Sequence, residues 1–96
     1  MNKYEIMMIL KPDLEDDAKN AVLDGFKAIL TEGEGVVDNV DTEKLGLREL
    51  AYEIKDYTKG LYVVIDTHTT PEAIAEFERL SRINLSVLRH LTLRRD

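Results

Sequence analysis

The chain has 96 residues, of which 44% are hydrophobic and 33% are charged, with a formal net charge of −6 and no cysteine. These values predict one soluble globular domain over residues 1–96, and they exclude disulfides and thiolate metal sites. No apolar run is long enough to span a bilayer, and the N-terminal sequence M-N-K-Y-E-I lacks the features of a signal peptide. A cytoplasmic protein is therefore expected.

Acidic charge is concentrated in the first half of the chain. Residues 1–44 contain 5 Lys and Arg against 11 Asp and Glu, whereas residues 45–96 contain 8 of each. From Arg82 to Arg95 there are 4 arginines and no acidic residue. Affinity for a phosphate backbone comes mainly from lysine and arginine, so the overall charge argues against a free-standing nucleic-acid binder. The last segment nevertheless offers a local cationic surface.

The first predicted elements are a strand and an amphipathic helix. Lys3–Leu10 is an apolar run bounded by the sequence K-P-D, as is typical of a strand in the centre of a sheet. Asp13 is expected to cap the helix, and Gly33 to end it. Apolar residues recur at helical spacing at Leu14, Ala18, Val22, Phe26, Ile29 and Leu30. This face of the helix is expected to cover the sheet.

The second strand is expected to begin soon after Gly35 and to contain Leu45–Ile54, whose sequence L-G-L-R-E-L-A-Y-E-I alternates as a strand does. Because this strand is too long to be flat, a loop or bulge is expected near Asp41–Gly46. Arg48 and Tyr52 share one face. An arginine beside a tyrosine suits a phosphate or a partner's carboxylate, although a strand with a solvated arginine explains the pattern equally well.

The remaining elements are a hairpin, a helix and a last strand. Lys55–Gly60 is interpreted as the hairpin connection and Leu61–Thr67 as the third strand. The sequence T-T-P-E from Thr69 begins the second helix. The apolar residues of that helix are Ala73, Ile74, Phe77 and Leu80. Leu85–Arg94 forms the last strand, and its pattern does not decide which of its faces meets the helices.

This order of elements predicts an α+β, ferredoxin-like βαββαβ fold. Two right-handed split crossovers place the first and third strands at the centre of a four-stranded antiparallel sheet with strand order 4-1-3-2. Both helices cover one face. The other face is expected to stay open and to expose an apolar patch of Met7, Ile9, Tyr62 and Val64. Two alternatives are that a long hairpin folds over this patch or that the chain self-associates through it.

The residues that most often carry catalysis or bind metals are poorly placed for either role. Ser81 and Ser86 are not in a strained elbow and have no evident histidine base nearby in sequence. His68 and His90 lie at strand ends without a short ligand spacing. The sequence therefore predicts a protein that is not an enzyme and that has no metal or cofactor.

Four pieces of the sequence occur in a particular order and spacing: Tyr4-Glu5, Pro12, the block Leu45–Ile54, and Gly60 leading into a strand. In this combination, which spans nearly the whole chain, the sequence resembles the bacterial ribosomal protein six family of the small subunit. The resemblance implies a structural constituent of the ribosome that binds the central domain of 16S ribosomal RNA. It also implies a heterodimer with a small, basic ribosomal protein, number eighteen, which would dock on the open sheet face.

The resemblance suggests where RNA would bind. Arg48 and Tyr4 match the family pattern directly, and Arg82 and Arg89 match it through the basic last strand and the turn before it. The predicted RNA-binding residues are Lys3, Tyr4, Arg48, Tyr52, Arg82, Arg89, Arg94 and Arg95. The simpler interpretation of each arginine is a solvated cation. Because the open face offers only Tyr62 for stacking, recognition of shape and backbone is expected rather than base readout.

A function of another class fits the composition as well. The chain would then be a non-ribosomal interaction or ligand-sensing domain of the same fold that homodimerises through its open sheet face. A ribosomal protein should co-purify with small subunits, whereas such a domain should run as a discrete homodimer without RNA.

Overall fold

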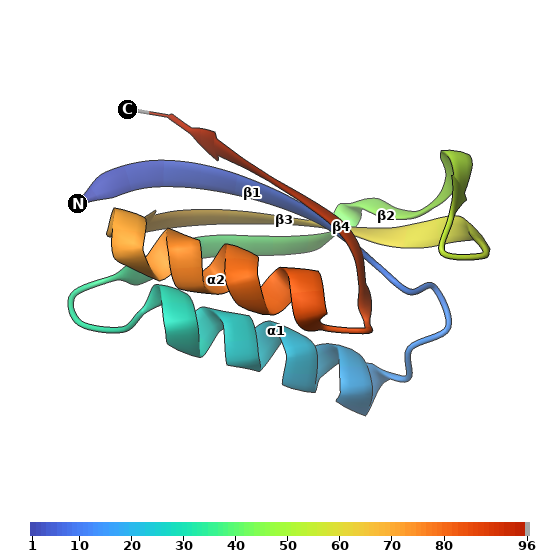
Figure 1. Ribbon diagram of the computed structural model, residues 1–96, viewed down its shortest axis with the longest axis horizontal. Coiled ribbons are helices and arrows are strands. Elements are labelled where there is room, and N and C mark those ends of the chain that lie inside the picture. Colours follow the sequence, from blue (N-terminus) through green and yellow to red (C-terminus); the bar gives the residue numbers. More distant parts are fainter. Residues whose placement is uncertain (96) are drawn as a thin grey trace.

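The computed structural model describes residues 1–95 and contains four strands and two helices (Figure 1). The elements are β1 (Asn2–Leu10), α1 (Asp16–Leu30), β2 (Val36–Ile54), β3 (Tyr57–Thr69), α2 (Pro71–Ile83) and β4 (Val87–Arg94). The strands form one antiparallel sheet in the order β2-β3-β1-β4, and both helices cover the same face of it. The predicted ferredoxin-like topology is therefore confirmed. No helix within residues 1–95 is long and apolar enough to cross a membrane.

The hydrophobic core lies between the sheet and the two helices. Alternate residues of β1 point into it, together with alternate residues of β3, because side chains of a strand alternate between its faces. The core residues of these two strands are Tyr4, Ile6, Met8, Leu10, Val63 and Ile65. Phe26 of α1 packs edge-to-face on Phe77 of α2, with ring centroids 5.0 Å apart. Burying each such side chain stabilises the fold by about 1.5–3 kcal/mol.

The two helices begin differently. At α2 the prediction is confirmed, since the Thr70 hydroxyl accepts a hydrogen bond from the Ala73 N–H at 3.1 Å and a proline follows the cap. At α1 the prediction was wrong, because the cap position is Glu15, which makes no side-chain cap hydrogen bond. Asp13 instead lies in a turn with Pro12, and this pair of residue types favours turns.

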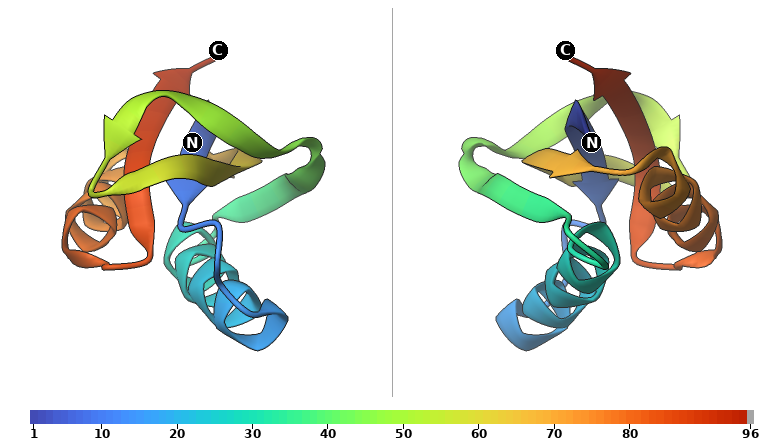
Figure 2. Two further views of the ribbon diagram at one scale, coloured as in Figure 1. Left: turned by 90° about the vertical axis from the view of Figure 1, so that its right-hand side faces the viewer. Right: turned by 90° about the vertical axis from the view of Figure 1, so that its left-hand side faces the viewer.

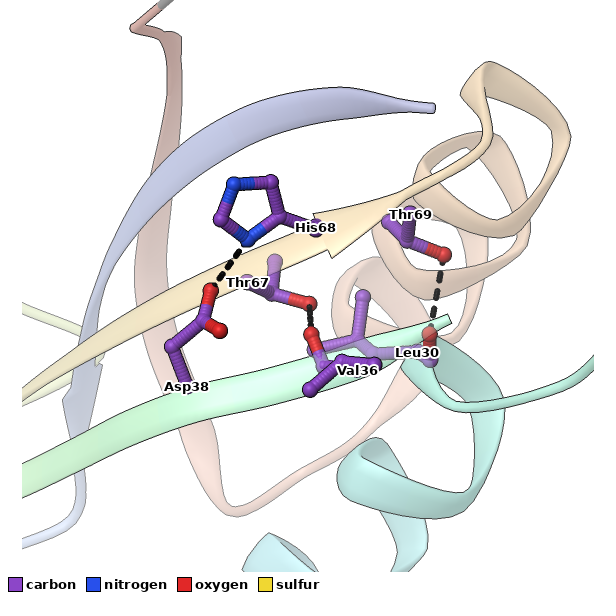
Figure 3. Close-up of polar contacts among 6 residues, drawn as sticks. All are labelled: Leu30, Val36, Asp38, Thr67, His68 and Thr69. Atoms are coloured by element: carbon purple, nitrogen blue, oxygen red, sulfur yellow. Dashed lines mark hydrogen bonds and ion pairs between the residues drawn. The ribbon is translucent and has the colours of Figure 1, made fainter. Parts of the chain in front are cut away.

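The connection from α1 to β2 is tied to the end of β3 (Figure 3). The Thr69 hydroxyl donates to the Leu30 carbonyl at 2.8 Å, and the Thr67 hydroxyl donates to the Val36 carbonyl at 2.6 Å. A Cβ at Gly35 would lie 2.0 Å from the Leu30 carbonyl oxygen, so only glycine fits there. These contacts position the first half of β2 at the edge of the sheet.

The β2–β3 hairpin is tighter than predicted. β3 begins at Tyr57, and the turn consists of Lys55 and Asp56, whose φ values of 47° and 70° are those that a two-residue hairpin turn requires. The predicted connection over 55–60 was therefore too long. Gly60 lies inside β3, where a Cβ would be 2.3 Å from Ile9 Cγ2, so this glycine allows a close approach and is not part of the turn.

A bulge bends the long second strand, as predicted. The register of β2 on β3 shifts between Asp41 and Gly46, and Gly46 has a φ of +62°. The Asp41 carboxylate accepts backbone hydrogen bonds from Lys44 at 2.8 Å and Glu43 at 3.0 Å, which lower its pKa. Beyond the bulge the ribbon curls out of the sheet plane and passes over the face that the helices leave free (Figure 2).

This curl corrects the expectation of a fully open sheet face. Ile9 does lie on the face away from the helices, but it is only 8% exposed because the ribbon covers it. Tyr62 and Val64 are half-buried, whereas Met7 remains 36% exposed. The alternative of a long hairpin folding over the patch is thus correct at one end of this face, and the other end stays open.

Candidate nucleic-acid interface

The curled hairpin brings the two outer strands of the sheet together. β2 and β4 are at opposite edges, yet Arg89 of β4 donates a hydrogen bond to the Tyr52 hydroxyl of β2. The Arg89 guanidinium also lies over the Tyr52 ring, 5.2 Å from its centroid. An exposed cation–π contact of this kind is worth about 0.5–1 kcal/mol. The structure therefore brings two of the predicted residues, from different strands, side by side, and the contact holds the arginine in place.

The tip of the hairpin adds a cation that the sequence analysis missed. The Lys55 ammonium donates to the Val87 carbonyl at 3.3 Å, which links the turn to the start of β4. In the sequence, Lys55 stands between acidic residues, Glu53 and Asp56, so a charge count does not reveal it. Its position could be found only from the contact across the sheet.

A hollow of about 260 Å³ lies between the hairpin tip, the end of α2 and the start of β4. We call it the cationic hollow. It is lined by Lys55, Ser81, Arg82, Arg89 and His90, with Val87 and Leu88 as its apolar wall. None of these lining residues is acidic. Two of the predicted arginines, from different elements, are thus brought together.

Arg48 lies outside this hollow. Its side chain is exposed, and its Nε donates to the Leu45 carbonyl at 2.9 Å within the bulged part of β2. It is on the same strand as Tyr52, four residues earlier. Arg48 can therefore extend a cationic surface along the ribbon without lining the hollow.

The other predicted cations gather at the opposite end of β4, beside the N-terminus. The Arg95 N–H donates to the Lys3 carbonyl at 2.8 Å, and the Arg95 guanidinium pairs with Glu5 at 2.6 Å. Arg94 donates to the Asn2 side chain at 3.1 Å. The 8 residues of β4 span about 25 Å, so the predicted RNA-binding residues form two groups.

Tyr4 does not behave as predicted. Its ring is only 7% exposed and belongs to the hydrophobic core, because it is on the helix-facing side of β1. Its hydroxyl accepts a hydrogen bond from the Asn2 side chain at 3.1 Å. The ring therefore cannot stack on a nucleotide.

The free part of the sheet face is both apolar and acidic. Met7 pairs with Val64 on one side and with Leu91 on the other, and Leu91 and Leu93 are 55% and 40% exposed. The sequence pattern placed the two leucines on one face of the last strand but did not decide which face meets the helices, and the pairing of Met7 with Leu91 shows that they lie on the free face. A second hollow, of about 300 Å³, adjoins Met7 and Val64, and its wall contains three carboxylate residues, Glu5, Asp41 and Asp66, against one lysine, Lys44.

Two comparisons with known proteins bear on this arrangement. The model of the ribosomal protein S6 family matches residues 3–94 of the chain. The crystal structure of the 30S ribosomal protein S6 from Thermotoga maritima is similar, with a TM-score of 0.86 and 30% sequence identity over 98% of this chain and 87% of that one. The chain therefore belongs to the ribosomal protein S6 family and is a ribosomal protein of the small subunit.

Proposed function

We propose that this chain is a structural constituent of the small ribosomal subunit that binds the central domain of 16S ribosomal RNA together with the small, basic ribosomal protein eighteen, as a heterodimer. Membership of the ribosomal protein S6 family supports a structural role in the cytoplasmic ribosome and not an enzymatic one. The RNA contact and the partner are the parts that the proposal adds.

One observation carries the proposal: two surfaces of opposite chemistry lie next to each other. The free sheet face combines exposed apolar side chains with carboxylates, and the hairpin end of the sheet carries cations without acidic neighbours in its hollow. A basic protein complements the first surface, and a phosphate backbone complements the second. An acidic chain can thus join RNA when its partner supplies most of the positive charge.

The docking surface for the partner is the exposed part of the sheet face. It consists of the exposed Met7, Leu91 and Leu93 and the half-buried Tyr62 and Val64. Ile9, which was predicted to belong to it, is covered by the chain's own hairpin and is left out. Exposed apolar side chains flanked by carboxylates suit a partner whose contact surface combines apolar residues with lysine or arginine.

The RNA contact is proposed at the hairpin end, through Arg48, Tyr52, Arg82 and Arg89. Lys3, Arg94 and Arg95 form a second, weaker group, because Arg95 is already paired with Glu5. These side chains reach phosphates and sugars, which position a protein on RNA without reading its sequence. Tyr52, at 57% exposed, is the aromatic residue of this surface that could also stack on a base.

Reconstitution tests the proposal. The chain is mixed with a 16S central-domain fragment, with and without ribosomal protein eighteen, and binding is measured by fluorescence anisotropy of the labelled RNA. We expect weak binding of the chain alone and tight, salt-sensitive binding of the mixture. A discrete homodimer that binds neither the RNA nor the partner would contradict the proposal and favour the interaction-domain alternative.

A further inference from the structure

We infer that the cationic hollow is a binding site for one phosphate group, with the Ser81 hydroxyl among its ligands. The inference rests on the proposed function, in which this phosphate belongs to the backbone of the bound RNA. It adds three residues, Lys55, Ser81 and His90, that the predicted RNA-binding set does not contain. The site is built from the hairpin tip, from α2 and from β4.

Ser81 is the feature of this hollow that needs an explanation. It lies on the buried side of α2, is 1% exposed, and lines the hollow. Its hydroxyl has no hydrogen-bond partner among residues 1–95. A serine inside a helix commonly bonds to a carbonyl of the preceding turn, and a buried hydroxyl without any partner destabilises a protein. The hydroxyl oxygen is itself buried, so a ligand oxygen that reached the floor of the hollow would satisfy this donor.

The cations around Ser81 are already positioned. Lys55 is held by the Val87 carbonyl and Arg89 by the Tyr52 ring and hydroxyl, so little side-chain freedom remains to be lost when an anion binds. Arg82 is exposed, next to Ser81 in sequence, and no ion pair or hydrogen bond within residues 1–95 engages its side chain. It is free to close over a ligand.

Two negatively charged groups near this site repel an anion, and the attraction of the cations must exceed that repulsion. The C-terminal end of α2 carries the negative end of the helix dipole. Glu78 lies 3.9 Å from the His90 ring, on the helix side of the hollow. Lys55, Arg82 and Arg89 outnumber these groups, and their donors fit the several acceptor oxygens of a phosphate. Loss of one cation should therefore weaken binding strongly.

The test uses the full chain and three probes: inorganic phosphate, the dinucleoside monophosphate UpU, and acetate. Each is titrated at constant ionic strength while backbone and arginine side-chain NMR signals are recorded. We expect saturable shifts at the hollow with phosphate and with UpU, and none at Lys3 or Arg95 at the other end of β4. Saturation by UpU shows that an internal phosphodiester fits, whereas saturation by inorganic phosphate alone would restrict the site to free phosphate and overturn its role in RNA binding.

Two variants and a matched control separate a ligand role from a structural one. Arg82→Gln should weaken phosphate binding about tenfold, and Ser81→Ala about fivefold, because each removes a hydrogen bond to a charged group. Arg79→Gln removes the same charge from an exposed position on the same helix, where the arginine pairs with Glu76, and should change little. Ser81→Ala should also raise the urea midpoint, since it removes a buried donor without a partner. A purely structural serine would not combine higher stability with lower affinity.

Several outcomes would overturn the inference. These are shifts that never saturate, equal losses in Arg82→Gln and Arg79→Gln, unchanged affinity in Ser81→Ala, or tighter binding of acetate than of phosphate, which would indicate a partner's carboxylate. Binding of the 16S fragment by the heterodimer is measured in parallel. Normal binding there, with no phosphate site in the hollow, would refute this inference alone, whereas a saturable phosphate site without RNA binding would refute the proposed function.

Discussion

The two ends of β4 carry the same kind of residue in different surroundings. At the terminal end, Arg95 pairs with Glu5, and Arg94 contacts Asn2. At the hairpin end, Arg89 rests on the Tyr52 ring, and Arg82 lines a hollow that contains no acidic side chain. Phosphate must displace a carboxylate at the first end but not at the second. The number of arginines in the last segment therefore overestimates how well the terminal end can bind phosphate and underestimates how well the hairpin end can.

The difference arises from the curl of the β2–β3 ribbon. The ribbon brings Tyr52 and Lys55 across the sheet to β4, where they hold Arg89 and complete the hollow. At the terminal end the cations of β4 lie beside β1, where Glu5 pairs with Arg95. Long-range packing, and not local charge, thus makes the hairpin end the better candidate for RNA contact.

Reversing the charge of two arginines at the hairpin end should have the largest effect on RNA affinity. Arg82→Glu with Arg89→Glu should weaken binding of the heterodimer to the 16S fragment about 100-fold, since each lost charged hydrogen bond costs about tenfold. The matched variant, Arg94→Glu with Arg95→Glu, changes the net charge equally and should lower the RNA affinity less than about threefold. The loss should be small because the Arg95 guanidinium is already paired with Glu5. Anisotropy titrations at fixed salt measure both. Equal losses would mean that net charge alone governs binding and that the two ends do not differ.

A change at Gly60 should show how far the hairpin end depends on the curl. Gly60→Ala places a Cβ against Ile9 Cγ2, which is on a stiff, branched side chain, and should cost about 2 kcal/mol in the free energy of unfolding. The ribbon should also lift, so that the NMR contacts between Tyr52 and Arg89 weaken.

The control for this change is Gly25→Ala on α1. Nothing lies within 4 Å of the added Cβ there, so the substitution should stabilise the helix by about 0.5–1 kcal/mol. Urea denaturation compares the two. If Gly60→Ala were as harmless as Gly25→Ala, the close approach of the ribbon to β1 would not matter for the fold.

The sequence predicted the fold because its signals are local. Alternation along β1 and the cap at Thr70 each depend on neighbouring residues, and together they determine the element order and hence the sheet topology. Asp13 shows the limit of this reasoning, since the same residue type favours caps and turns. Leu91 and Leu93 show another, because alternation placed them on one face of the last strand but could not decide whether that face meets the helices.

The site was predicted less completely because it depends on contacts between distant segments. Arg82 and Arg89 were found from a run without acids. Lys55 was missed, because its contact is with Val87, 32 residues away. The burial of Ile9 was left open as an alternative. The curl that buries it follows from the combined geometry of a bulge and a glycine, and the periodicity of the sequence does not encode that geometry.

Removing the Tyr52 hydroxyl tests the difference between the two ends of β4 with a smaller expected effect. Tyr52→Phe keeps the ring under the Arg89 guanidinium but removes the acceptor of its hydrogen bond. We expect about a twofold to threefold loss of RNA affinity, because Arg89 becomes less ordered before binding. Tyr57→Phe, on the other strand of the same hairpin, is the control and should leave affinity unchanged. An equal loss in both variants would argue that the hairpin acts only through its overall stability.

The smallest expected effect concerns the bulge that starts the curl. Backbone hydrogen bonds from Lys44 and then Glu43 hold the pKa of Asp41 below that of an unstructured aspartate. The carboxylate is the form that accepts them, so this contribution is complete above the ordinary pKa and is lost as the pH falls through the lowered one. Carbon-13 NMR of the carboxyl group should show the lowered titration, and the Lys44 amide shift should follow it. In Asp41→Asn the Lys44 amide should no longer respond over the same acidic range. A carboxyl that titrates at the ordinary value would mean that the bulge does not depend on this ion, and that Gly46 and the register shift suffice to direct the ribbon toward β4.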